Sequence, residues 1–381
     1  MTGTGPGSPT RVALDVSAIP TQAQGAGNYV LELARALRHR DDVALTCLAR
    51  RDDTARWGDA TGGPVAGIAP SGRVARVAYG ELLLGWRAGR VAGSPEVFHG
   101  PHYTLPHGLR LPGVVTVHDL LFVTHPEWHE RSKVAYFTRA IERSARRAAV
   151  LVCVSERTRA ELLERFRPRG EVLVAPHGID AERFSPDEPA EGADAAVLAR
   201  HRIEGPYVLH VGTIEPRKDL PGLIEAFDEV ARDRPGLQLV LAGRRGWGTE
   251  TLDEAVAAAR ASVLELGFVE VTEVAALMRR AAVVAYPSRA EGFGLPALEA
   301  LATGVPLVTT SDSAMSDLAG EAALTVAAGD HAALAAAIES CMTDSAGVAR
   351  RRGLGLELAA HATWEASANV HAAAYRLAAG H

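Results

Sequence analysis

The chain has 381 residues, 47% of them hydrophobic, so it is long enough for two domains with apolar cores. It contains no run of roughly eighteen apolar residues, which argues against a membrane-spanning helix, and its net charge of −6 argues against a nucleic-acid-binding protein. The charge is uneven, because residues 1–187 carry +4 and the remainder carries −10. A mildly basic first half suits an anionic surface or acceptor.

Residues 1–10, MTGTGPGSPT, are small and polar and lack the charged and apolar segments of a signal peptide, so we expect a disordered lead-in. The cysteines Cys47, Cys153 and Cys341 lie far apart in apolar or helical surroundings. Such surroundings favour buried free thiols over disulfides or a metal site. Together these features predict a cytoplasmic protein.

The first half alternates short apolar runs with amphipathic stretches. We expect strands at residues 11–18, 42–50, 96–100, 113–120, 149–155 and 171–180. We expect helices at residues 28–40, 131–149 and 156–166. Because strands that alternate with helices form parallel sheets covered by helices, residues 11–187 are predicted to form a Rossmann-like domain.

Near residues 184–200 a segment rich in Pro, Asp, Glu and Ala breaks the pattern and indicates a linker. The alternation resumes over residues 200–362, which predicts a second Rossmann-like domain. Strands are expected at residues 207–212, 237–243, 263–269, 283–288 and 306–310, with helices beginning at Leu220, Thr251, Thr272 and Leu295. A last helix is expected at 363–380. The predicted fold class is therefore α/β with two parallel-sheet domains, whose ligands would bind beyond the carboxyl ends of the strands.

One of these strand ends continues into EGFGLPALEA, residues 291–300. Its glycines allow a ligand to approach the backbone, and a helix that begins here would present free N–H groups to a phosphate. Glu291 and Glu299 would repel a phosphate, so they are better suited to the hydroxyl groups of a sugar and a ribose. Two glutamates at this spacing also occur on solvated helix faces, and the pair alone does not distinguish these alternatives.

Two further strand ends combine glycines with cations. In HVGTIEPRKDL (210–220), Gly212 is followed by Arg217 and Lys218, which can neutralise diphosphate oxygens. In LAGRRGWG (241–248), Gly243 precedes two more arginines. The alternative is a pair of ordinary turns with surface cations, but all these residues share one predicted edge of the sheet.

EGFGLPALEALATGVPLVTT, HVGTIEPRKDL and VAPHGIDAERFSP (174–186) together resemble the retaining glycosyltransferases of family 4, from about residue 11 to the C-terminus. The resemblance implies the GT-B fold, two Rossmann-like domains facing across a cleft. It implies that the N-terminal domain binds the acceptor, that the C-terminal domain binds a nucleotide sugar, and that residues 363–381 cross back to the N-terminal domain. Thr213 departs from the family pattern, which often has arginine there, and His177 stands where an asparagine is common.

The residues and the resemblance together give a candidate site. Glu291 would contact the transferred sugar, Glu299 the ribose, Arg217 and Lys218 the leaving diphosphate, and His118 the sugar from the other domain. The remaining donor contacts would be Gly25, Gly27, Gly212, Gly243, Gly292, Phe293, Gly294 and Leu295, and the acceptor contacts would be His99, His102 and Asp119. No Asp-x-Asp motif occurs, so no metal is expected, and the nucleotide sugar is a co-substrate rather than a cofactor.

The sequence therefore predicts a metal-independent hexosyltransferase that acts on a glycan, glycolipid or natural-product hydroxyl. VGTIEPRK most resembles the family members that use GDP-mannose, which favours mannose as the transferred sugar, although family members that use UDP-sugars share much of this segment. One alternative is a nucleotide-sugar 2-epimerase, which would need no acceptor, and another is a binding protein that has lost catalysis. A nicotinamide-dependent dehydrogenase is disfavoured, because QGAGNYV (24–30) lacks the third glycine of the dinucleotide fingerprint.

The helix expected at 131–149 is rich in basic residues. It carries Arg131, Lys133, Arg139, Arg143, Arg146 and Arg147. One hypothesis is a peripheral contact with anionic lipid or a phospholipid-linked acceptor at the inner membrane face. The alternative is a solvated helix face.

Overall fold

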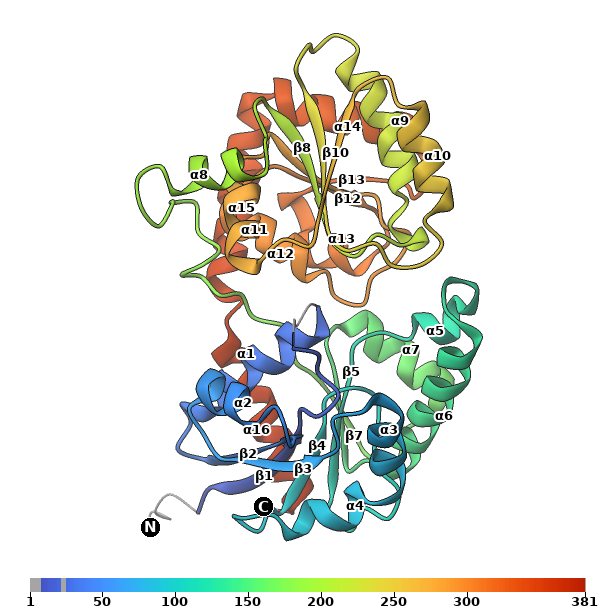
Figure 1. Ribbon diagram of the computed structural model, residues 1–381, viewed down its shortest axis with the longest axis vertical. Coiled ribbons are helices and arrows are strands. Elements are labelled where there is room, and N and C mark those ends of the chain that lie inside the picture. The colour runs from blue at the N-terminus through green and yellow to red at the C-terminus, as the bar shows by residue number, and fades with distance from the viewer. Residues whose placement is uncertain (1–7, 22–24, 381) are drawn as a thin grey trace. The chain divides into compact units, whose positions relative to one another are not determined.

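A computed structural model describes residues 8–21 and 25–380 of the chain, which form two compact units (Figure 1). The first unit runs to Gly178 and also contains the chain from Trp364 onward, whereas the second is Ile179–Thr363. Most of the lead-in expected at residues 1–10 lies outside the described residues, and Thr10 is the first residue of a strand.

The first unit is built on a seven-stranded sheet in the order β3-β2-β1-β4-β5-β6-β7, in which every neighbouring pair is parallel. The strands are β1 (Thr10–Asp15), β2 (Val43–Arg50), β3 (Val65–Ala69), β4 (Val97–Gly100), β5 (Gly113–Val117), β6 (Val150–Cys153) and β7 (Glu171–Val174). Alternate residues of β1 enter different cores, since Val12 and Leu14 pack on one face and Ala13 on the other. The sheet is therefore covered on both faces, which parallel strands require.

Helices of the first unit are α1 (Ala26–Arg38), α2 (Thr54–Thr61), α3 (Arg73–Leu82), α4 (Leu84–Arg87), α5 (Leu121–Thr124), α6 (Arg131–Arg147), α7 (Glu156–Phe166) and α16 (Trp364–Ala379). Helix α16, drawn in dark red in Figure 1, packs beside α1 although it ends the chain. Tyr29 of α1 and Tyr375 of α16 are fully buried in the same core. Ile141 of α6 and Leu162 of α7 belong to the core on the opposite face.

The second unit has a six-stranded parallel sheet in the order β10-β9-β8-β11-β12-β13. Its strands are β8 (Tyr207–Val211), β9 (Gln238–Ala242), β10 (Ser262–Gly267), β11 (Val283–Tyr286), β12 (Leu307–Thr310) and β13 (Leu324–Val326). Its helices are α8 (Ala193–Arg200), α9 (Leu220–Ala231), α10 (Glu250–Ala258), α11 (Val271–Arg280), α12 (Leu295–Thr303), α13 (Ala314–Ala319), α14 (His331–Thr343) and α15 (Ser345–His361). The predicted fold class, two Rossmann-like parallel-sheet domains, is confirmed.

Several elements differ from the sequence-based expectation. Part of the segment expected as a linker forms α8 inside the second unit, where buried Asp194 makes an ion pair of 2.7 Å with Arg279 of α11. The edge strands β3 and β13 were not predicted, because runs of five and three residues are too short to show a clear strand pattern. The three cysteines are buried and free, as predicted. In the part of the chain that is described, no helix has the length and apolar character needed to span a membrane.

Candidate active site

The carboxyl ends of β8 and β11 bring two cations and a carboxylate together in the second unit. After β8, Arg217 and Lys218 lie in a short 3₁₀ turn, Pro216–Lys218, and Glu291 lies in the loop after β11. The Arg217 guanidinium is 2.7 Å from Glu291 Oε1, and the Lys218 ammonium contacts the same oxygen. Only 4% of Lys218 is exposed. The three side chains therefore form a buried, charge-paired cluster at the predicted edge of the sheet.

The cluster shifts the protonation of its members. Burial alone would raise the pKa of Glu291, but Arg217 and Lys218 outweigh burial and lower that pKa to about 2. Burial lowers the pKa of Lys218, and the Glu291 carboxylate opposes this effect. Removal of Glu291 would therefore leave Lys218 with burial and the Arg217 charge, which favour its neutral form, and with Glu215, which opposes them.

Helix α12 begins beside this cluster, at Leu295, and its N-cap is Gly294. Gly294 has φ of +97°, and an added Cβ would lie 2.5 Å from Met315 Cγ, so a side chain would be both strained and crowded there. Pro296 occupies the first turn of the helix, where a missing N–H costs little. The loop of Gly292 and Phe293 thus leads into a helix N-terminus that suits an anion.

The ends of β8 and β9 approach so closely that Gly243 has no room for a side chain. A Cβ atom added there would overlap the carbonyl oxygen of Gly212. Of the two arginines that follow, Arg244 stacks 4.4 Å from the ring centroid of Phe268, and Arg245 makes ion pairs with Asp253 and Glu265. These arginines therefore have partners within the unit.

We expect Gly243→Ala to lower the melting temperature by several degrees. A crowded methyl group costs about 1–3 kcal/mol of unfolding free energy. Each kcal/mol lowers the melting temperature of a domain of this size by roughly 2–4 °C. Gly353→Ala is the matched control, since Gly353 lies within α15 with nothing within 4 Å of an added Cβ. That control should be as stable as the parent or more so. Equal melting temperatures for parent and Gly243→Ala would show that the strand ends can separate freely. Differential scanning calorimetry measures the melting temperatures of the parent and of both variants.

Glu299 lies one turn into α12 and is 9% exposed. Burial raises its pKa to about 8, with Arg183 opposing the shift. Glu299 is therefore mostly protonated at neutral pH, unlike Glu291, although both carboxyls belong to the same strand-end segment. A ligand that donates hydrogen bonds to Glu299 would favour its ionised form.

Sequence reasoning missed His210, a polar residue in the otherwise apolar strand β8. It is fully buried, its Nδ1 donates to the Ala285 carbonyl at 3.0 Å, and its Nε2 has no hydrogen-bond partner among the described residues. Burial lowers its pKa to about 3, so the ring is neutral. The only signal in the sequence was one histidine within YVLHV.

Sequence reasoning also missed Asp219, which follows Lys218 in a left-handed conformation with φ of +51°. Its carboxylate lies 3.4 Å from Arg289 and 3.3 Å from His331. These contacts attach the loop that carries the two cations to the loop after β11 and to α14.

In the first unit, His118 and Asp119 follow β5. Burial lowers the pKa of His118, whose Nε2 donates to the Pro101 carbonyl at 2.8 Å, so Nδ1 carries the lone pair of the neutral ring. Asp119 accepts the backbone N–H of Leu121 at 3.0 Å and a hydroxyl proton from Tyr103 at 3.3 Å. His118 is 8% exposed, so its ring is close to the surface of the unit.

The two other histidines expected at the acceptor differ in position. His99 is completely buried, and its ring nitrogens bond to Tyr375 at 2.8 Å and Thr116 at 2.9 Å. It joins α16 to the sheet, so we place His99 in the core rather than in the lining of a site. His102 is partly exposed and its ring centroid lies 5.0 Å from that of His118.

The glycines Gly25 and Gly27 lie at the start of α1, which begins two residues before the expected position. Gly25 is the N-cap, with φ of +49°, and Gly27 is buried in the first turn. The preceding residues 22–24, which include Gln24 of QGAGNYV, lie outside the described residues.

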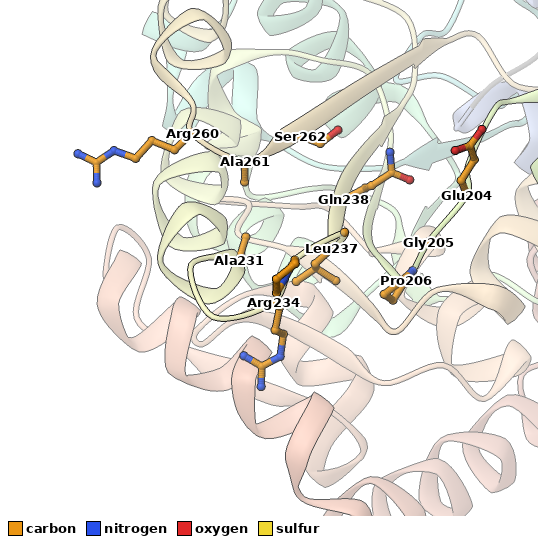
Figure 2. A pocket seen from close by; sticks show the side chains of 12 residues that line it. Glu204, Gly205, Pro206, Ala231, Arg234, Leu237, Gln238, Arg260, Ala261 and Ser262 are labelled. Atoms are coloured by element: carbon orange, nitrogen blue, oxygen red, sulfur yellow. The ribbon is translucent and has the colours of Figure 1, made fainter.

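A separate pocket lies at the opposite edge of the second sheet (Figure 2). Its lining residues Pro206, Leu237 and Ala261 immediately precede β8, β9 and β10, whereas the charged cluster follows the carboxyl ends of the strands. Figure 2 shows Arg260 directed outward from the pocket. The pocket therefore does not belong to the candidate active site.

Two Rossmann-like units with a cation pair and a helix N-terminus at one strand edge define the class of GT-B glycosyltransferases. Solved structures agree on the fold: sucrose-phosphate synthase from Thermosynechococcus elongatus matches with a TM-score of 0.74 at 21% identity, covering 96% of this chain and 98% of the other. HepE of Anabaena, solved in complex with UDP-glucose, matches with a TM-score of 0.73 at 17% identity, covering 95% and 98%.

Sequence comparisons identify the family. Residues 199–354 match the model for glycosyl transferases group 1, and residues 23–183 match that for glycosyltransferase family 4. The O-antigen chain mannosyltransferase B of Escherichia coli is 31% identical over 286 residues, which are 74% of each chain. The chain belongs to the group 1 glycosyltransferases of family 4 and is a hexosyltransferase, as the sequence motifs predicted.

Proposed function

We propose that this enzyme transfers a hexose, with mannose from GDP-mannose favoured, from a nucleoside-diphosphate sugar to an acceptor hydroxyl with retention at the anomeric carbon. The paired cluster of Arg217, Lys218 and Glu291 beside the N-terminus of α12 carries the proposal. The 31% identity to a mannosyltransferase supports the choice of sugar.

In this mechanism the barrier falls mainly because charge on the departing diphosphate is stabilised. Arg217, Lys218 and the N–H groups at the start of α12 supply the positive charge. Both cations contact Oε1 of Glu291, so we assign Oε2 to the hydroxyl groups of the transferred sugar. The acceptor attacks from the face that the diphosphate leaves, and a diphosphate oxygen takes the acceptor's proton.

The other residues have supporting roles in this proposal. Gly212, Gly243, Gly292, Phe293, Gly294 and Leu295 hold the donor in the second unit, together with Glu299 at the ribose. His118 contacts the sugar, Gly25 and Gly27 approach the phosphates, and His102 and Asp119 meet the acceptor. The acceptor is a glycan, a glycolipid or a small natural product.

Thermal unfolding with GDP, UDP, ADP and NAD, each at millimolar concentration, tests the donor assignment. A ligand at about 100 times its dissociation constant stabilises the folded protein by roughly 2.7 kcal/mol, which raises the melting temperature measurably. We expect a rise with GDP, followed by mannose transfer from GDP-mannose to an acceptor. A rise with UDP or ADP alone would reassign the donor, and one with NAD alone would contradict the proposal. Conversion of the nucleotide sugar without an acceptor would favour the epimerase alternative.

Nucleotide binding should release a proton from Glu299. Its pKa is about 8 in the free protein, so about 90% of the carboxyl groups are protonated at pH 7. Hydrogen bonds from ribose hydroxyls favour the carboxylate, so we expect release of up to about one proton per nucleotide. Calorimetric titrations in buffers of different ionisation enthalpy measure this number. Glu299→Gln should abolish the release, and an unchanged value in that variant would contradict the ribose assignment.

A further inference from the structure

Exposed apolar side chains gather along α3 and α4 of the first unit. Nine large hydrophobic side chains of the described residues are exposed, and five of them fall between residues 74 and 86. We call these five, Val74, Val77, Leu82, Leu83 and Trp86, the α3–α4 apolar surface. Val74 is 84% exposed and Leu82 is 75% exposed, so these side chains have almost no cover from the rest of the unit.

The orientation of this surface is fixed by residues on the opposite side of the same segment. Tyr79, Leu84 and Ala88 are buried and pack in the core formed by β1, β5 and α6. The segment is thus anchored by these three side chains, and the α3–α4 apolar surface is not covered by that core. Clustered exposed apolar side chains of this kind mark interaction sites, whereas single ones are ordinary.

The segment that carries the apolar surface is positively charged. Residues 73–90 contain four arginines and one acidic residue, Glu81. Glu81 is already paired, because its carboxylate lies 3.1 Å from the Arg143 guanidinium of α6. The Arg90 guanidinium stacks 4.1 Å from the ring centroid of Trp86, at the rim of the apolar surface. The segment therefore presents aliphatic and aromatic side chains with the cation of Arg90 at their border.

Helix α6 extends the cationic border. Tyr136 of α6 donates to Glu81 at 3.4 Å, so α6 lies beside α3, as Figure 1 also shows. Arg139 is exposed and shares a helix face with Tyr136 and Arg143, at spacings of three and four residues. Two other cations of α6 have nearby carboxylate partners, Lys133 with Glu130 at 3.0 Å and Arg146 with Glu142 at 3.7 Å. The basic helix singled out in the sequence is thus the edge of a larger surface whose centre is apolar.

We propose that the α3–α4 apolar surface docks the protein onto an anionic lipid bilayer. Leucine, valine and tryptophan side chains enter the headgroup region, and the exposed cations Arg90 and Arg139 bind lipid phosphates. The proposal uses none of the residues assigned to the donor or the acceptor, so it can fail without affecting the proposed transfer. A second copy of the chain fits less well, because in a two-fold dimer this cationic surface would meet itself.

Co-sedimentation of the full chain with vesicles tests the proposal. At low salt we expect binding to vesicles of phosphatidylcholine with phosphatidylglycerol and at least tenfold weaker partitioning to phosphatidylcholine alone. Leu82→Gln/Leu83→Gln should reduce partitioning to the anionic vesicles at least tenfold. Arg90→Gln should reduce it several-fold, since one cation near an anionic surface contributes on the order of a fivefold change.

The matched control is Leu377→Gln, which removes a leucine that is 51% exposed on α16 of the same unit. It should partition like the parent, and all variants should keep the parent's melting temperature and its response to nucleotide. Absence of binding to anionic vesicles, or unchanged binding in Leu82→Gln/Leu83→Gln, would overturn the proposal. A dimer in light scattering that this double variant disrupts without vesicles would instead assign the surface to a second copy.

Discussion

Glu291→Ala should lower the turnover number at least tenfold, which corresponds to about 1.4 kcal/mol of lost transition-state stabilisation. The variant loses the carboxylate that we assign to the sugar hydroxyls. It also removes the carboxylate that buried Lys218 contacts, which lowers the pKa of this lysine further, so more of it becomes neutral and cannot offset charge on the departing diphosphate. Steady-state rates at saturating donor and acceptor measure the effect.

Lys218 of the same cluster gives a second variant, and the exposed residue Glu321 gives the control. Lys218→Ala should also lose at least tenfold in turnover, while Glu321→Ala, whose side chain is 83% exposed, should retain the parent rate. Breaking a buried ion pair costs about 3–5 kcal/mol of stability, so each variant is first shown to be folded by its far-ultraviolet circular dichroism. Near-normal turnover in folded Glu291→Ala or Lys218→Ala would reject this placement of the active site.

Acidification from about pH 6.5 toward pH 4 should progressively destabilise the first unit. The unit holds five histidines whose pKa is lowered by burial: His99, His102, His118, His177 and His371. The unfolded chain takes up protons near the ordinary pKa of 6.5, whereas the folded unit resists protonation. The stabilisation is therefore complete above about pH 6.5 and is lost as pH falls toward the folded pKa values.

The loss of stability can be given a size for His371, which is fully buried and has a pKa of about 4. Lowering the pH from 7 to 5 should cost about 2 kcal/mol of unfolding free energy for such a group. Urea unfolding at several pH values, followed by tryptophan fluorescence, measures this dependence. Four of the five tryptophans belong to the first unit, and Trp57 and Trp364 are buried there, so the signal reports mainly on that unit.

Two variants separate this cause from general acid sensitivity. His371→Phe should flatten the pH dependence, although it also removes hydrogen bonds to Tyr29 and Ser367 and so lowers the absolute stability. His39→Gln changes an exposed histidine at the end of α1 and should leave the dependence unaltered. An identical pH slope in the parent and in His371→Phe would contradict the role of this buried histidine.

The sequence was informative about the elements that carry strong apolar patterns. Strands such as β8 and β11 and helices such as α1, α9 and α12 were predicted near their observed positions. The weak elements were not, because β3 and β13 lie at sheet edges where one side needs no apolar cover. Helix α8 was hidden within a segment rich in proline and acidic residues, although ADAAVLAR itself favours a helix.

The candidate site was predictable in its residue types and its edge of the sheet. The carboxyl ends of parallel strands meet at one edge, so glycines and cations after β8, β9 and β11 had to be neighbours. The sequence did not predict that Glu291 binds Arg217 and Lys218 directly, since these residues are more than seventy positions apart. It also did not predict Asp219 and His331, which attach the same loop to α14.

By itself, the sequence determined the alternation of strands and helices, the family motifs and the place of the cations at strand ends, because each depends on short-range periodicity or local turn chemistry. Only the tertiary structure decided which side chains are covered. Packing of α16 on the sheet buries His99, and the absence of such packing over Val74 and Leu82 leaves an apolar surface exposed. Burial of a side chain depends on segments that are distant in the sequence, and local sequence patterns do not indicate which segments will pack there.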